Sequence, residues 1–218
     1  VIDNFLKEEY LEQILHSVKK LKDNNATSKF VNSTSEHEYN KFCFSKIDYL
    51  DTILQDIFTE LSSNLFIEYI EKLTKIYKLI KNVRNLKGAG IHRVRSGGYL
   101  GLHADFNMYR DISYGIIDRR INLLIYLNPE WKDTYNGHFL IADLKEKKIV
   151  NKISPLLNRC VIFNTTSQSI HGHPKTLNTP PNVNRESIAT YYYTKNINNM
   201  NDFENNKHRT TTFYNYDL

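Results

Sequence analysis

The sequence predicts a mostly β protein, a sandwich or barrel of strands backed by N-terminal helices. Up to about residue 80, apolar residues recur every three or four positions, which is typical of amphipathic helices. From residue 88 onward, apolar runs of four to seven residues are separated by Gly, Pro, Asn and Asp, which is typical of strands. A helical block followed by many short strands favours this layered architecture.

Three amphipathic helices are expected, in chain order. The first covers about residues 6–21 and ends at Asp23-Asn24-Asn25, and the second covers about 47–61. Helical spacing then continues over 65–80, after a possible break at Ser62-Ser63-Asn64. The residues between the first two helices, up to about Ser45, read as a polar stretch.

The second half of the chain predicts a series of short strands. They are expected at residues 91–94, 99–102, 121–127, 138–141, 149–153, 159–163 and 187–193. We therefore expect one domain over residues 1–195, with helical support over about 1–87 and a β core over about 88–195. Residues 196–218 are polar and Asn-rich, and read as a C-terminal tail.

Composition narrows the function classes. The 218 residues are enough for one sizeable core, and the formal net charge of +5 is spread along the chain without a basic stripe, which argues against nucleic acid as a partner. No apolar run approaches the roughly 20 residues of a membrane span, and no basic-then-apolar signal segment opens the chain. Cys43 and Cys160 are too few for a disulfide framework, so a cytoplasmic location is expected.

Two side chains of the Gly-rich stretch before residue 106 form a candidate metal motif. His103 and Asp105 are two residues apart, so on a strand they point to the same face. With one distant histidine they would complete the two-histidine, one-carboxylate set that leaves iron positions open for other ligands. The motif alone has a high false-positive risk, and its simplest alternative is an exposed strand end.

A second group of residues strengthens this interpretation. His171 follows an apolar strand 66 residues after Asp105, enough chain for several strands to return across a sheet. Arg185 and Ser187 share a face of the next expected strand. A guanidinium beside a hydroxyl suits a buried carboxylate, because arginine offers planar, paired donors. The joint order of these motifs is much less expected by chance than any one of them.

These motifs resemble the prolyl-4-hydroxylase-like family of 2-oxoglutarate/Fe(II)-dependent dioxygenases. The similarity extends over about residues 88–195, and loosely over the N-terminal helices. It is carried by residues 98–107, 119–131, 135–140, 171–174 and 185–194, together with the opening segment 1–6.

The resemblance implies a double-stranded β-helix, or jelly-roll, core with N-terminal α-helices packed on it. It places Fe(II) on His103, Asp105 and His171. It places the distal carboxylate of 2-oxoglutarate on Arg185 with Ser187, and a hydrogen bond to this co-substrate on Tyr126. O₂ is the other co-substrate, and ascorbate is a candidate reductant.

Some positions depart from the family pattern or leave alternatives open. Relatives often carry a Tyr upstream of the first iron motif, whereas the comparable stretch here is His92-Arg93-Val94-Arg95, so we assign no residue there. Asn136 replaces the first Gly of a usual pair. His173 would face the same way as His171 on an extended chain and is the competing ligand, although the motif favours His171.

The implied activity is hydroxylation of an unactivated C–H bond, with 2-oxoglutarate converted to succinate and CO₂. The first choice of substrate, by resemblance alone, is a prolyl residue of a peptide or protein, and the alternative is a free amino acid or a sugar-containing metabolite. Dealkylation of nucleic acid is disfavoured because residues 185–191 lack the Asn and second Arg of the AlkB-like motif. A catalytically inactive jelly-roll binding protein is the alternative of another class, but such proteins usually break the iron triad. The sequence does not specify an oligomeric state.

Overall fold

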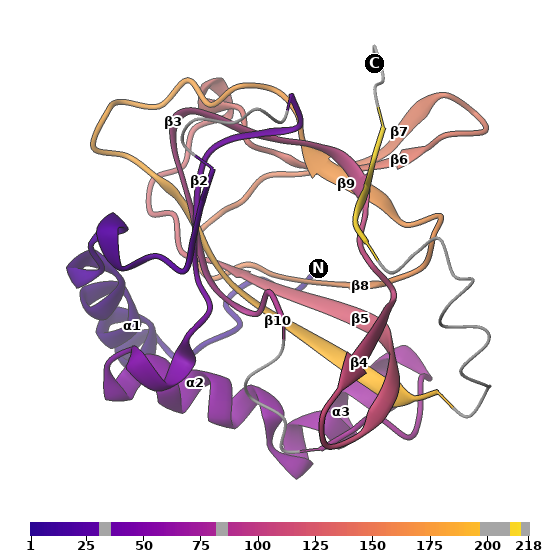
Figure 1. Ribbon diagram of the computed structural model, residues 1–218. Coiled ribbons are helices and arrows are strands. Elements are labelled where there is room, and N and C mark those ends of the chain that lie inside the picture. The colour runs from indigo at the N-terminus through magenta and orange to yellow at the C-terminus, as the bar shows by residue number, and fades with distance from the viewer. Residues whose placement is uncertain (31–35, 82–86, 197–209, 215–218) are drawn as a thin grey trace.

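Three helices from the first third of the chain cover one face of a large antiparallel sheet that curls around an interior (Figure 1). This computed structural model describes residues 1–30, 36–81, 87–196 and 210–214. The helices are α1 (Glu8–Lys20), α2 (Thr52–Ser62) and α3 (Asn64–Thr74), with short 3-10 turns η1 (Asp23–Asn25), η2 (Ile47–Tyr49) and η3 (Asp133–Tyr135). Within the described ranges, none of the helices is long and apolar enough to cross a membrane.

Side-chain caps mark the starts of α2 and α3. Asp51 Oδ1 accepts from the Leu54 amide at the start of α2, and Ser63 ends α2 while its hydroxyl caps α3. The expected third helix is shorter than predicted and ends at Thr74. Lys75 adopts a left-handed conformation with φ 60°, and the chain then turns back toward the sheet.

Eleven strands are present in the described residues. They are β1 (Ser28–Phe30), β2 (Glu38–Phe44), β3 (Gly90–Ala104), β4 (Met108–Asp111), β5 (Gly115–Tyr126), β6 (Phe139–Asp143), β7 (Lys148–Ile153), β8 (Cys160–Asn164), β9 (Ile170–His173), β10 (Arg185–Lys195) and β11 (Thr212–Phe213). Their order runs β4-β5-β10-β3-β9-β6-β7, with β2 and β11 also paired to β3, β1 to β2, and β8 to β5. The predicted jelly-roll with helices packed on it is confirmed.

Strand β3 links the two halves of this jelly-roll. Its first half pairs with β10, where Arg185 lies opposite Val94, and its second half pairs with β9, where His171 lies opposite His103. The change of partner occurs at the bend around Gly98. A side chain there would collide with Val94 and with backbone oxygens within 3 Å, so glycine is required at the bend.

The segment that reads as a polar stretch up to Ser45 contains two strands that the sequence did not predict, β1 and β2. Strand β2 is hard to recognise in the sequence because its alternation is broken where it crosses the β3 bend. Asn40 adopts φ 52° and its side-chain amide donates to the Ser96 carbonyl at 2.8 Å. Beyond this point Phe42 and Phe44 are buried in the core shared with the helices.

Part of the predicted C-terminal tail also joins the sheet. Phe213 of β11 lies opposite His103 on β3, and the Tyr214 amide donates to the Leu102 carbonyl at 2.9 Å. Residues 197–209 and 215–218 lie outside the described residues. The described part of this segment thus lies directly beside the first predicted iron motif.

The main core fills the space between the helices and the sheet. Its fully buried members include Ile14 of α1, Leu54 of α2 and Ile70 of α3, packed with Ile121 and Ile188 of the sheet. The opposite face of these central strands points into the jelly-roll and is far more polar. The functional candidates lie on this inner face.

Candidate metal centre and co-substrate cavity

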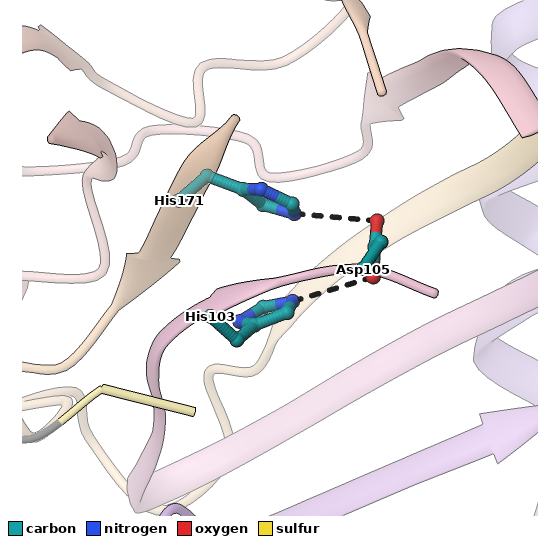
Figure 2. A group of neighbouring side chains, drawn as sticks. All are labelled: His103, Asp105 and His171. Carbon is teal, nitrogen blue, oxygen red and sulfur yellow. Dashed lines mark ion pairs between the residues drawn. The ribbon is translucent and has the colours of Figure 1, made fainter. Parts of the chain in front are cut away.

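Three side chains meet inside the jelly-roll in the arrangement of a metal site (Figure 2). One ligand atom each from His103, Asp105 and His171 lies within 4.8 Å of the others. His103 is on β3, Asp105 follows directly after this strand, and His171 is on the neighbouring β9. The predicted alternation places the first two on one face, and the β3–β9 pairing brings the third to them.

Backbone carbonyls fix the orientation of both imidazoles. His103 Nδ1 bonds the Gly101 carbonyl at 2.9 Å, and His171 Nδ1 bonds the Ser169 carbonyl at 2.8 Å. When Nδ1 carries the proton and donates this hydrogen bond, the lone pair of Nε2 is available to bind a metal. Each Nε2 lies 3.5 Å from an oxygen of Asp105. Burial, with His171 nearby, lowers the pKa of His103, which favours the neutral, ligating form.

Two buried side chains of β5 hold the carboxylate of Asp105. Arg119 Nη2 donates to Oδ2 at 2.9 Å, and Asn122 Nδ2 donates to the same oxygen at 2.6 Å. Arg119 Nε also bonds Asn122 Oδ1 at 2.8 Å, so the three groups form one network. Burial opposes ionisation, but Arg119 and the two histidines outweigh it and hold the pKa of Asp105 well below its usual range.

The sequence interpretation missed Arg119 and Asn122 as parts of the site. The available signal was Asn122, a polar residue within an otherwise apolar strand run. A buried amide in such a run needs hydrogen-bond partners, and here these are Asp105, Arg119 and the Thr165 hydroxyl, at 3.2 Å.

The donor set fits one first-row metal ion. Two imidazole nitrogens and one ionised carboxylate that lie close together correspond to the facial triad of non-haem iron proteins. The outer contacts of His103, His171 and Asp105 are those that usually orient metal ligands. No further protein carboxylate is needed to complete the set.

A cavity of about 110 Å³ extends from this centre along the inner face of the sheet. Arg185 and Ser187, which the sequence placed on one face of a strand, both line it from β10. The lining residues are Lys41, His92, Val94, Leu100, His103, Asp105, Arg119, Asn122, Leu124, Phe139, Phe163, His171, Gly172, His173, Arg185, Ser187 and Tyr191. Lys41 and His92 were not anticipated as members of this site.

Arg185 is a buried cation held in a fixed orientation. It is 6% exposed, its Nε donates to the Gly137 carbonyl at 2.7 Å, and its Nη2 donates to the Tyr126 hydroxyl at 3.3 Å. Gly137 has φ 67° and no room for a side chain, so its carbonyl can approach the guanidinium. Burial lowers the pKa of Arg185, and among the described residues no carboxylate forms an ion pair with it.

The other candidate residues occupy distinct places. Tyr126 is fully buried and does not line the cavity. Its hydroxyl contacts Arg185, which does. His173 lines the cavity but is not part of the three-residue metal group. Arg95 is half exposed and forms an ion pair with Asp23 on the far side of the strand.

Comparisons with known proteins point to one family. The model of the 2OG-Fe(II) oxygenase superfamily matches residues 89–193. No curated protein matches the chain in sequence. A prolyl hydroxylase of Trichoplax adhaerens, solved with a fragment of the hypoxia inducible factor oxygen degradation domain, aligns with a TM-score of 0.59 at 18% identity over 89% of this chain and 82% of its own.

Two further structures share the fold. A prolyl-4-hydroxylase of Pseudomonas putida aligns with a TM-score of 0.59 at 13% identity, covering 89% of this chain and 91% of its own. HygX of Streptomyces hygroscopicus, solved with nickel, 2-oxoglutarate and hygromycin B, aligns with a TM-score of 0.55 at 12% identity, covering 99% and 91%. At these identities the likeness concerns the fold.

The matched segment runs from β3 to β10 and so contains the whole metal group and Arg185. The family match, the jelly-roll and the metal-binding geometry therefore agree. Residues 89–193 match the 2OG-Fe(II) oxygenase superfamily, and this match, the prolyl-4-hydroxylase-like fold and the metal-binding group together support a 2-oxoglutarate- and iron-dependent dioxygenase.

Proposed function

We propose that this enzyme hydroxylates an unactivated C–H bond of a prolyl residue in a peptide or protein, with Fe(II) on His103, Asp105 and His171. The observation that carries the proposal is the single cavity that joins this metal group to a buried Arg185, which forms no ion pair within the described part of the chain. When bound, the iron with O₂ and 2-oxoglutarate supplies the oxidising chemistry, and the protein supplies geometry and a dry site.

The residues of the chain divide this work between two ends of the cavity. At one end, the fixed Nε2 atoms of His103 and His171 and the ionised Asp105 hold the metal. At the other end, Arg185 receives the distal carboxylate of 2-oxoglutarate, with Ser187 as a second donor. The Tyr126 hydroxyl accepts from Arg185 Nη2 and so helps to orient the guanidinium, while its direct contact with the co-substrate stays a prediction.

The prolyl substrate is favoured by the structural neighbours, since two of those described above are prolyl hydroxylases. A sugar-containing metabolite is the second candidate, because HygX, which was solved with hygromycin B, aligns with nearly the whole chain. A free amino acid is the third candidate, because it offers the same kind of C–H bond as a prolyl residue in a smaller molecule. An inactive binding protein is disfavoured by the intact metal group and Arg185.

The test is turnover of 2-oxoglutarate by the purified, Fe(II)-loaded protein. Succinate release is measured first without a primary substrate, and then with proline-containing peptides, free amino acids and aminoglycosides. We expect basal turnover in the wild type, stimulation by a proline peptide, and loss of turnover in His103→Ala and Asp105→Ala with the fold retained. Full turnover in either variant at saturating Fe(II) would show that the iron is bound elsewhere.

A further inference from the structure

A second cation reaches the cavity from a strand that the sequence did not predict. Lys41 of β2 lies opposite Val94 of β3, and Val94 in turn lies opposite Arg185 of β10. Residues directly opposite one another in antiparallel strands point to the same face. All three accordingly line the same cavity, with the two cations on either side of Val94.

Val94 leaves space between the two cations. Its side chain is short, whereas those of Lys41 and Arg185 are long, and all three line one cavity. The side chain of Lys41 is 15% exposed, and its ammonium is held by Glu38 at 2.9 Å. Lys41 therefore has a defined position at the cavity wall, and its stem is buried rather than extended into solvent.

The same part of the cavity contains a buried polar atom without a partner. His173 is 4% exposed, and its Nδ1 makes no hydrogen bond in the described structure. Arg185 and Lys41 line the same cavity as His173. Two cations and an unsatisfied imidazole nitrogen around one small cavity are suited to a ligand that carries several acceptor oxygens.

We propose that Lys41 is a further binding residue, and the second cation, for the distal carboxylate of 2-oxoglutarate, which lies between its ammonium and the Arg185 guanidinium; this rests on the proposed function above. Arg185 already uses Nε on Gly137 and Nη2 on Tyr126. Lys41 adds a charged donor from the opposite side of Val94, so that the carboxylate is held between two cations.

The position of Lys41 assigns it to this end of the co-substrate. Lys41 and Arg185 both lie beside Val94, in the half of β3 that pairs with β10. The metal group belongs to the other half of β3, beyond the bend at Gly98, where β9 is the partner. Lys41 is thus expected to contact the distal carboxylate and leave the 2-oxo acid head to the metal.

Calorimetry with the Mn(II)-loaded protein tests this assignment without turnover. The ligands are 2-oxoglutarate and 2-oxovalerate, which has the same 2-oxo acid head and a methyl group in place of the distal carboxylate. Lys41→Met should raise the Kd of 2-oxoglutarate about tenfold or more, as expected on losing a charged hydrogen bond, and change that of 2-oxovalerate less than about twofold. Lys41→Arg should restore most of the affinity.

The controls separate this proposal from the one it rests on. Lys147→Met alters an exposed lysine on a turn and should leave both dissociation constants unchanged. If wild-type protein does not bind 2-oxoglutarate, or Arg185→Leu binds it normally, the proposed function fails. If those controls behave as expected and Lys41→Met binds 2-oxoglutarate like the wild type, the role of Lys41 is refuted.

Equal weakening of both ligands would also refute the proposal, because it would place Lys41 in support of the metal end or of the cavity's shape. Thermal unfolding of the unliganded variants reports whether each one folds. Should Lys41→Met fail to fold, Lys41→Gln keeps a polar side chain beside Glu38, and the same selective loss of 2-oxoglutarate affinity is expected from it.

Discussion

Replacing Arg185 by Leu perturbs the co-substrate site most directly. The guanidinium is buried, which lowers its pKa, and among the described residues no carboxylate forms an ion pair with it. A dicarboxylate bound to the metal would bring that anion. Removing one partner of a buried, hydrogen-bonded charge pair costs on the order of 2–5 kcal/mol, so the Michaelis constant for 2-oxoglutarate should rise roughly 30- to 4000-fold.

The unliganded variant should keep nearly wild-type stability because two effects oppose each other. Leucine removes a buried charge, which stabilises the fold, but leaves the Gly137 carbonyl without its donor, which costs about 1–3 kcal/mol. The stability of the wild type and of Arg185→Leu should therefore differ more in the presence of the ligand than in its absence. At 100 times its Kd, 2-oxoglutarate should stabilise Mn(II)-loaded wild type by about 2.7 kcal/mol, or roughly 5–10 °C in Tm, and Arg185→Leu hardly at all.

The ordering among variants makes this prediction specific. Ser187→Ala should weaken the binding of 2-oxoglutarate by about 1 kcal/mol, the contribution of one hydroxyl donor. Arg110→Leu, at an exposed residue of β4, should have no effect on this binding. Metal affinity should be unchanged in all of them. A wild-type Michaelis constant in Arg185→Leu would refute the reasoning, since the distal carboxylate would then bind elsewhere, with the half-exposed Arg95 as the next candidate.

Three further predictions concern the metal centre and the buried histidines. His171→Ala should abolish Mn(II) binding in a calorimetric titration, whereas His173→Ala should retain it; the opposite pattern would exchange their roles. Asn122→Ala should lower metal affinity about 10- to 100-fold, because Asp105 loses a donor at 2.6 Å, and unchanged affinity would mean that this contact does not orient the ligand. Burial lowers the pKa of His92 to about 4, so below pH 6.5 the unfolded chain binds a proton that the folded protein does not. Stability should therefore fall as pH drops, by about 2 kcal/mol more at pH 5 in wild type than in His92→Gln, as measured by urea unfolding at pH 7.5 and 5.

Features of the site that depend on local spacing could be predicted from the sequence. His103 and Asp105 are two residues apart on a strand, and so are Arg185 and Ser187, so their shared faces follow from the period of the strand alone. The distant His171 needed the family resemblance, because many arrangements of strands could follow Asp105. The structure brings it to the first two through its pairing with β3.

Features that depend on tertiary contacts could not be predicted in this way. The clamp on Asp105 combines Arg119 and Asn122 of β5 with a residue beyond the end of β3, and no local pattern links these positions. The C-terminal strand β11 is two residues long and has no hydrophobic period to reveal it. Its place beside His103 is determined by a sheet edge that other parts of the chain create.

Lys41 shows how strongly such a role depends on register. Between the pairs Tyr39–Tyr99 and Lys41–Val94, β2 advances by two residues while β3 advances by five, because β3 bends there around Gly98. A change of one residue in register moves every side chain of a strand to the opposite face. The bend of β3 therefore determines that Lys41 enters the cavity beside Arg185 and is not directed into the core under the helices. A second cation for the co-substrate can arise in this fold from the shape of a neighbouring strand, without any motif in its own sequence.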